Sequence, residues 1–143
     1  MEHLEYAWKM DHPADAVWKI VGDFGSEIIA KGFVDKVETV GEGIGMIRIF
    51  HLAQHLGGQP IKERLDDIDH ERRSYAYSIT DAGPLPFTGY SGRITVTPCG
   101  PNACYIMAHI QMLPVTATAE ECRLISKNNM RMFYENVRNA LNS

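Results

Sequence analysis

Glu63 occupies a position where an apolar side chain would be expected. Residues 60–65 alternate between outward and inward positions, and Glu63 falls on the same side as Ile61 and Leu65. A carboxylate on an apolar face loses its hydration and holds its proton more tightly, unless a cation pairs with it. A general base that works near neutral pH is prepared in this way. The alternative is that Glu63 forms a salt bridge with Lys31 and takes part in no chemistry.

His109 lies in another alternating run, residues 103–113, and shares one side of that run with Tyr105 and Met107. If this side faces a cavity, the imidazole can exchange protons with a carboxylate, a phenol and a carbonyl substrate. The alternative is a core histidine whose hydrogen bonds are satisfied within the protein.

Lys31 and three tyrosines supply further polar groups. Lys31 can bind an anionic or carbonyl group, or form a Schiff base when it is buried. The alternative is a solvated lysine at the end of a helix. Tyr77 and Tyr90 are interpreted as amphipathic lining that hydrogen-bonds a ligand, whereas Tyr75 is expected to be an ordinary strand-packing residue.

The residues around Glu63 and Tyr90 predict an antiparallel meander. Three alternating runs lie within residues 59–96, separated by an acidic turn at 66–70 and a GPLP loop at 83–86. The mixture of tyrosines and a glutamate on the inward side suits the lining of a cavity better than a filled core. Arg48 and Arg93 are expected to be solvated.

The other predicted elements surround this meander. The pattern predicts a strand with Leu4, Tyr6 and Trp8 on one side, then two short helices, further strands and a long helix capped by Thr116 or Thr118. The stripe of the long helix is expected to contain Cys122, Ile125, Asn129, Met132 or Phe133, Asn136 and Leu141. The predicted ranges are 2–10, 33–40, 45–52 and 103–113 for the strands, and 14–21, 26–31 and 117–142 for the helices.

This order predicts an α+β fold in a single domain, residues 1–143. A curved antiparallel sheet of about seven strands wraps around the long C-terminal helix and leaves an internal ligand cavity between them. The expected boundaries of the cavity are the sheet, the helix, the loop at 84–86 and the loop at 55–60.

Four stretches resemble the START-like superfamily, also called SRPBCC or the birch-pollen-allergen fold. They read PADAVWKIVGDFG at 13–25, GIGMIR at 43–48, ERLDDID at 63–69 and GPLP at 83–86. The similarity is to the polyketide cyclase/dehydrase-like branch, and it implies a helix-grip architecture. This fold hosts cyclases, lyases, carriers and receptors, so the resemblance alone does not select one function.

The abscisic acid receptors of plants look like more distant relatives. Laid over their ligand cavity, Lys31 falls on a lysine that meets the hormone carboxylate, and Glu63, Tyr90 and His109 fall on other polar cavity positions. The chain lacks the gate motif and the latch histidine–arginine pair of these receptors, so hormone reception is not implied.

The residues and the resemblance together predict a catalytic set and a binding set. Glu63 and His109 would exchange protons, Tyr90 would donate to an oxygen and Lys31 would anchor an anionic end. The predicted ligand-binding residues are Phe50, Leu52, Tyr77, Ile79, Leu85, Phe87, Met107, Asn129 and Phe133.

The predicted function is binding of a small hydrophobic or aromatic, polyketide-like molecule, with cofactor-independent cyclisation, dehydration or lyase chemistry on it. The alternative is a carrier or sensor without catalysis. A third reading is a homodimeric module that binds a partner.

Composition excludes several other classes. The 143 residues carry a net charge of −4 and no long basic run, so we expect no nucleic-acid partner. No apolar run approaches the roughly 18 residues of a membrane span, and the first residues do not predict a signal peptide.

The three cysteines favour reduced thiols and a cytoplasmic setting, because the number is odd. A disulfide between Cys99 and Cys104 across a hairpin is the less favoured alternative. We expect no cofactor and no metal, since His51 and His55 straddle a strand end and have no third ligand nearby in sequence.

Overall fold

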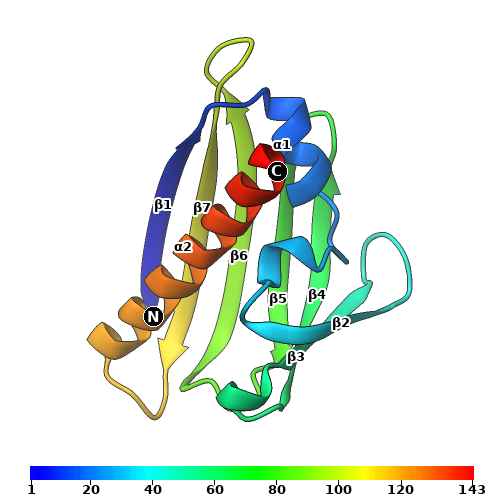
Figure 1. Ribbon diagram of the computed structural model, residues 1–143. Helices are drawn as coiled ribbons and strands as arrows, with labels where there is room; N and C mark the ends of the chain where they lie inside the picture. The colour runs from blue at the N-terminus through cyan, green and yellow to red at the C-terminus, as the bar shows by residue number, and fades with distance from the viewer.

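Seven strands form one antiparallel sheet that curves around a long helix (Figure 1). A computed structural model describes all 143 residues. The order in the sheet is β1-β7-β6-β5-β4-β3-β2, which makes β1 and β2 the edges. The strands are β1 (Glu2–Met10), β2 (Val34–Val40), β3 (Ile47–Leu52), β4 (Pro60–Asp69), β5 (Ser74–Asp81), β6 (Phe87–Pro98) and β7 (Cys104–Pro114). The helices are α1 (Ala14–Val21) and α2 (Ala119–Asn142), with two 3-10 turns, η1 (Ile28–Ala30) and η2 (Gln54–Leu56).

The predicted α+β fold with a seven-stranded sheet and a long C-terminal helix is therefore confirmed. The helix predicted for residues 26–31 is wrong in type and length. Only the turn η1 forms, and the backbone of Lys31 is already extended, with φ −57° and ψ 131°. Ser26 does sit at its start, where its Oγ accepts a hydrogen bond from the amide of Ile28 at 3.1 Å.

The curvature of the sheet comes from irregularities in the strand pairing. Register shifts occur between β4 and β5 at residues 65–67 and between β6 and β7 at residues 88–91, and such bulges bend the strand that carries them. Gly92 matters at this bend, because a Cβ there would lie 2.8 Å from the ring of Tyr77. The glycine thus allows the Tyr77 ring to approach the backbone of β6 closely.

The helix α2 runs across the concave face of the sheet, from the N-terminal end of β1 to the side of α1 (Figure 1). Thr118, one of the two predicted caps, accepts a hydrogen bond from the amide of Glu121 at 3.1 Å, and Thr116 does not cap the helix. Asn136 donates to the backbone carbonyls of Ile29 and Lys31 at 3.1 and 3.0 Å. These two bonds fix η1 against α2. Neither α1 nor α2 combines the length and the apolar character needed to cross a membrane.

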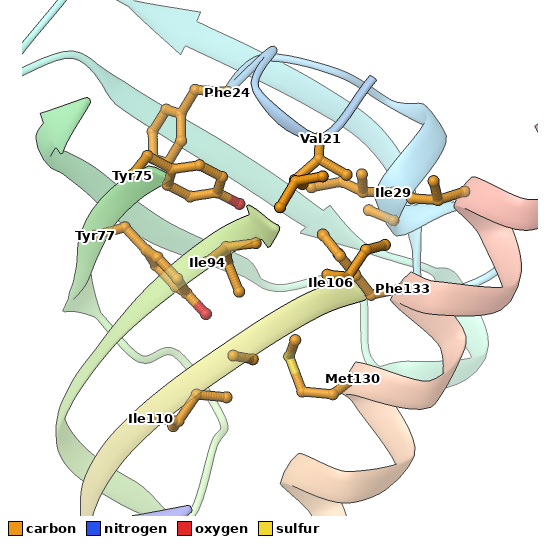
Figure 2. Packing of buried hydrophobic residues seen from close by; sticks show 14 of the residues in the cluster. Val21, Phe24, Ile29, Tyr75, Tyr77, Ile94, Ile106, Ile110, Met130 and Phe133 are labelled. Atoms are coloured by element: carbon orange, nitrogen blue, oxygen red, sulfur yellow. The ribbon is translucent and has the colours of Figure 1, made fainter. Parts of the chain in front are cut away.

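The face of α2 that meets the sheet differs from the predicted stripe. Met130 and Phe133 point toward Ile106 of β7, while Tyr77 reaches in from β5 (Figure 2). Of the predicted stripe, Cys122 and Phe133 are buried. Sequence reasoning skipped a polar residue that the helix buries, Ser126. The buried residues of α2 are Cys122, Ser126, Met130, Phe133 and Val137.

Candidate ligand cavity

A cavity of about 100 Å³ lies between the concave face of the sheet and α2. Of its 17 lining residues, 13 are hydrophobic, so the wall is mainly apolar with a few polar groups. The sheet, η1 and the loops contribute Ile29, Ala30, Phe33, Arg48, Phe50, Ile61, Glu63, Tyr77, Ile79, Leu85, Phe87 and Tyr90. The helix α2 contributes Ser126, Asn129, Met130, Met132 and Phe133.

Most of the predicted site residues line this cavity. Glu63 and Tyr90 do so from β4 and β6, as the alternation predicted. Seven of the nine predicted binding residues line it too: Phe50, Tyr77, Ile79, Leu85, Phe87, Asn129 and Phe133. Tyr75 is buried behind the wall, in agreement with its predicted packing role.

The predicted placement of His109 and Met107 in the cavity is wrong. Both lie on the outer side of β7, because the inward side of that strand carries Ile106, Ala108 and Ile110. The His109 side chain is 52% exposed, and its Nδ1 lies 3.3 Å from a carboxylate oxygen of Glu5 on the neighbouring strand. A proton exchange between His109 and Glu63 within one site is therefore excluded by the fold.

Lys31 is also outside the cavity. It follows η1 with an exposed side chain, and only its backbone is engaged, through the amide to the carbonyl of Ile28 and through the carbonyl to Asn136. Leu52 is buried in the core but does not line the cavity, and the loop at 55–60 contributes no lining residue. Neither the predicted salt bridge of Glu63 with Lys31 nor a lysine anchor in the cavity is formed.

The partner of Glu63 is Arg48, which sequence reasoning had placed in solvent. Nε and Nη2 of Arg48 both lie 2.6 Å from Oε1 of Glu63, and the two residues are only 3% and 7% exposed. They are directly opposite each other in the pairing of β3 with β4. The signal was present in the sequence, because Arg48 alternates with Phe50 and Leu52, which were both assigned to the inside.

Aromatic rings and a backbone carbonyl complete the surroundings of Arg48. Its guanidinium carbon lies 3.9 Å from the centre of the Phe24 ring, 4.9 Å from that of Phe50 and 5.2 Å from that of Tyr77. Nη1 donates to the carbonyl oxygen of Phe24 at 3.2 Å. Burial by itself lowers the pKa of Arg48, but the charge and hydrogen bond of Glu63, together with Tyr75 and Tyr77, outweigh burial and raise the pKa above its usual value. Arg48 is thus a permanent cation held by one carboxylate and a cage of rings.

Two tyrosine hydroxyls meet on the same side of the cavity. The hydroxyl oxygens of Tyr77 and Tyr90 are 3.2 Å apart, so one donates to the other. Burial raises the pKa of Tyr77 well above its usual value, with further contributions from Tyr90 and Glu63. Burial likewise raises the pKa of Tyr90. Both phenols therefore stay protonated at neutral pH and act as hydrogen-bond donors, not as bases.

Ser126 faces the cavity from the opposite wall. It is 2% exposed, and its Oγ has no hydrogen-bond partner in the protein. A buried hydroxyl without a partner costs about 1–3 kcal/mol, and native proteins rarely keep one without a reason. A ligand with a polar atom in the cavity would satisfy it.

Most polar groups of the cavity are already engaged with one another. The carboxylate of Glu63 is already paired, the phenols are protonated, and no imidazole or amine lines the cavity. What remains for a ligand is an apolar enclosure with hydroxyl groups on two walls. A cluster of three or more histidine, cysteine, aspartate or glutamate side chains that could hold a metal is not found.

Known proteins resemble the chain in sequence and in fold. The sequence model of a family described as "Polyketide cyclase / dehydrase and lipid transport" matches residues 1–127. No curated protein sequence matches the chain. XoxI from Bacillus cereus superposes with a TM-score of 0.85 at 22% identity, over 98% of this chain and 95% of XoxI.

Norcoclaurine synthase from Thalictrum flavum superposes with a TM-score of 0.80 at 19% identity, over 98% of this chain and 86% of the enzyme. A structure of the same enzyme in complex with dopamine and hydroxybenzaldehyde gives a TM-score of 0.75 at 18% identity, with coverages of 98% and 86%. At these identities the structural matches establish a shared fold.

Breaking the Arg48–Glu63 pair from either side should destabilise the protein. Arg48→Met leaves a buried carboxylate without a cation, and Glu63→Leu leaves a buried guanidinium without an anion. Each should lower the free energy of unfolding by about 3–5 kcal/mol in urea titrations at pH 7. The double variant should lower the free energy of unfolding by about 2 kcal/mol less than the sum of the two single variants, because it buries no unpaired charge.

The exposed pair Arg64–Asp66, with 2.7 Å between Nε and Oδ1, is the matched control. Arg64→Met should cost less than about 1 kcal/mol. Strict additivity of the Arg48 and Glu63 substitutions would show that the two side chains are not coupled.

The buried phenol of Tyr77 should make the protein sensitive to alkali. The pKa of Tyr77 is higher in the folded protein than in the unfolded chain, where it is near 10. The protonated phenol therefore contributes fully to the free energy of unfolding below pH 10. This contribution is lost as the pH rises from there toward the folded-state pKa. Between pH 10 and 11 the free energy of unfolding of the parent should fall by up to about 1.4 kcal/mol more than that of Tyr77→Phe. The control is Tyr105→Phe, at an exposed tyrosine on the outer side of β7. Its free energy of unfolding should fall by as much as that of the parent. Equal losses in all three proteins would contradict the protonated, buried state of Tyr77.

Proposed function

The chain belongs to the polyketide cyclase / dehydrase and lipid transport family of the START-like (SRPBCC) superfamily, and from that premise we propose that it binds a small hydrophobic or aromatic molecule in its internal cavity. The observation that carries the proposal is the buried, unpartnered hydroxyl of Ser126 within an otherwise mainly apolar wall. A folded protein gains from filling such a space with a molecule that is apolar over most of its surface and polar at one point.

The size of the cavity limits the ligand. Its volume of about 100 Å³ is below the roughly 300–1,000 Å³ of pockets that enclose drug-sized molecules. A single aromatic ring with one or two short substituents is the size that we propose. The rings of Phe50, Phe87 and Phe133 provide flat apolar surfaces for it. Hydroxybenzaldehyde, which norcoclaurine synthase holds in a structure of the same fold, is a probe of this size.

Filling the cavity should abolish this binding. Ala30 lines the cavity and is buried, so the three further carbons of Ala30→Leu project into the space that the ligand needs. We expect at least a ten-fold weaker Kd for hydroxybenzaldehyde by titration calorimetry, since the loss of about 1.4 kcal/mol corresponds to that factor. Ala7→Leu, on the exposed side of β1, is the matched control and should bind as the parent does. Unchanged affinity in Ala30→Leu, or binding in neither protein, would contradict the proposed site.

A second candidate function is acid–base catalysis without a cofactor, as cyclisation, dehydration or lyase chemistry on an aromatic or polyketide-like substrate. The observation that favours it is the placement of a carboxylate, Glu63, and two protonated phenols in one cavity. Glu63 would accept a proton and Tyr90 would donate one to a developing oxyanion. Arg48 already occupies one oxygen of this carboxylate, and for this reason binding is the first proposal.

Turnover assays on one carboxylate variant and one imidazole variant separate catalysis from binding alone. The substrate is a single-ring β-hydroxy ketone, 4-hydroxy-4-phenylbutan-2-one, whose dehydration needs one proton acceptor and one proton donor, and the conjugated ketone product is followed by chromatography. Glu63→Gln should lower kcat by about 100-fold or more, whereas His109→Ala, on the outer side of β7, should retain the parent rate. Circular dichroism confirms that both variants fold. A full rate in Glu63→Gln, or no product from the parent, would contradict the catalytic candidate and favour a carrier or sensor.

The cytoplasm remains the proposed compartment. The three cysteines are free thiols in the structure, with Cys99 exposed and Cys104 and Cys122 buried. Thiols in this state are typical of reducing compartments.

A further inference from the structure

The charges that line the cavity cancel each other. Among its 17 lining residues only Arg48 and Glu63 carry a charge, and they are bound to each other at 2.6 Å. The expected lysine anchor, Lys31, lies outside. The cavity therefore presents no net charge to a ligand.

Arg48 has little left to offer an anion. Nε and Nη2 lie against Glu63, Nη1 donates to the carbonyl of Phe24, and the Phe24 ring covers the guanidinium at 3.9 Å. An anion that approached the remaining N–H groups of Arg48 would compete with Glu63 for one cation, so one of the two negative charges would be left unbalanced. Both bonds from Arg48 end on Oε1 of Glu63, and an ammonium group that reached the other oxygen would lie beside Arg48 as a second cation for one carboxylate. Either ion would also lose its hydration on entry without a countercharge to replace it.

A neutral polar group of a ligand can hydrogen-bond to hydroxyl groups of the cavity wall that are still free. The Ser126 hydroxyl has one proton to donate and lone pairs to accept, and the protein uses neither. Of the Tyr77 and Tyr90 hydroxyls, 3.2 Å apart, one donates to the other, so one phenolic proton is left for a ligand oxygen. Both partners suit a hydroxyl, an amide or a carbonyl group.

We propose that the cavity selects neutral, single-ring molecules that carry a hydroxyl or carbonyl oxygen, and that this oxygen hydrogen-bonds to Ser126. The proposal rests on the ligand-binding function proposed above and names the class of ligand for the same site. It differs from the expectation of an anionic ligand end held by a lysine.

Two pairs of isosteric probes test the selection by charge. Benzamide and benzoate differ in charge but hardly in shape, and benzyl alcohol and benzylamine, which is protonated at pH 7, form the second pair. Titration calorimetry at pH 7 should give at least about ten-fold tighter binding of the neutral member in each pair. Equal or tighter binding of an ion would overturn the inference and leave the ligand-binding function standing. Binding of none of the four probes would overturn the ligand-binding function itself.

Ser126→Ala tests the assigned hydrogen bond. The variant should bind benzyl alcohol about ten-fold more weakly than the parent, the loss typical of one hydrogen bond in a buried site, and should bind toluene, which has no oxygen, as the parent does. Because the hydroxyl has no partner in the protein, the free variant should be no less resistant to urea than the parent. Benzyl alcohol binding that is unchanged in Ser126→Ala would overturn the role of Ser126.

Discussion

The cavity depends on one buried interaction, the ion pair between Arg48 of β3 and Glu63 of β4. Each of these charges alone would be too costly on the concave face of the sheet, and each makes the other tolerable. The pair also connects three parts of the chain, because Nη1 of Arg48 reaches the carbonyl of Phe24 beyond α1. Well-packed apolar residues would often stabilise a core as much as such a pair does. Stability alone therefore does not explain why the pair lies at the cavity wall.

The fold was predictable because its signals are local and repeated. Periodicity predicted the bounds of α1, the shared side of Leu4, Tyr6 and Trp8 in β1, and the alternation of the meander. Capping chemistry narrowed the start of α2 to Thr116 or Thr118. The turn η1 was not predictable as such, since six residues between glycines carry too little pattern to separate an α-helix from a 3-10 turn. The buried face of α2 was only partly predictable. A polar residue such as Ser126 looks like a surface residue until the sheet opposite it is known.

Strand alternation predicts only part of the candidate site. Alternation placed Glu63 and Tyr90 inside, and the same rule applied to β3 places Arg48 beside Phe50. Arg48 was nevertheless expected in solvent, because arginine side chains are seldom buried. For His109 the strand has apolar residues on both sides, so alternation could not select the inner side, and the resemblance to a receptor cavity selected the wrong one. The position of Lys31 depends on where η1 ends and lies beyond what local sequence determines.

The ion pair between Arg48 and Glu63 also bears on whether the cavity suits binding or catalysis. A carboxylate that takes a proton from a substrate becomes neutral, so Arg48 would lose its countercharge at the moment of reaction while remaining buried among rings. Catalysis by Glu63 thus requires either that the substrate supplies a new negative charge near Arg48 or that the pair opens. Binding of a neutral molecule requires neither, because the pair stays intact and only the apolar wall, the phenols and Ser126 change their contacts. The physical cost of disturbing the ion pair is what favours a ligand-binding role for this cavity over a reactive one.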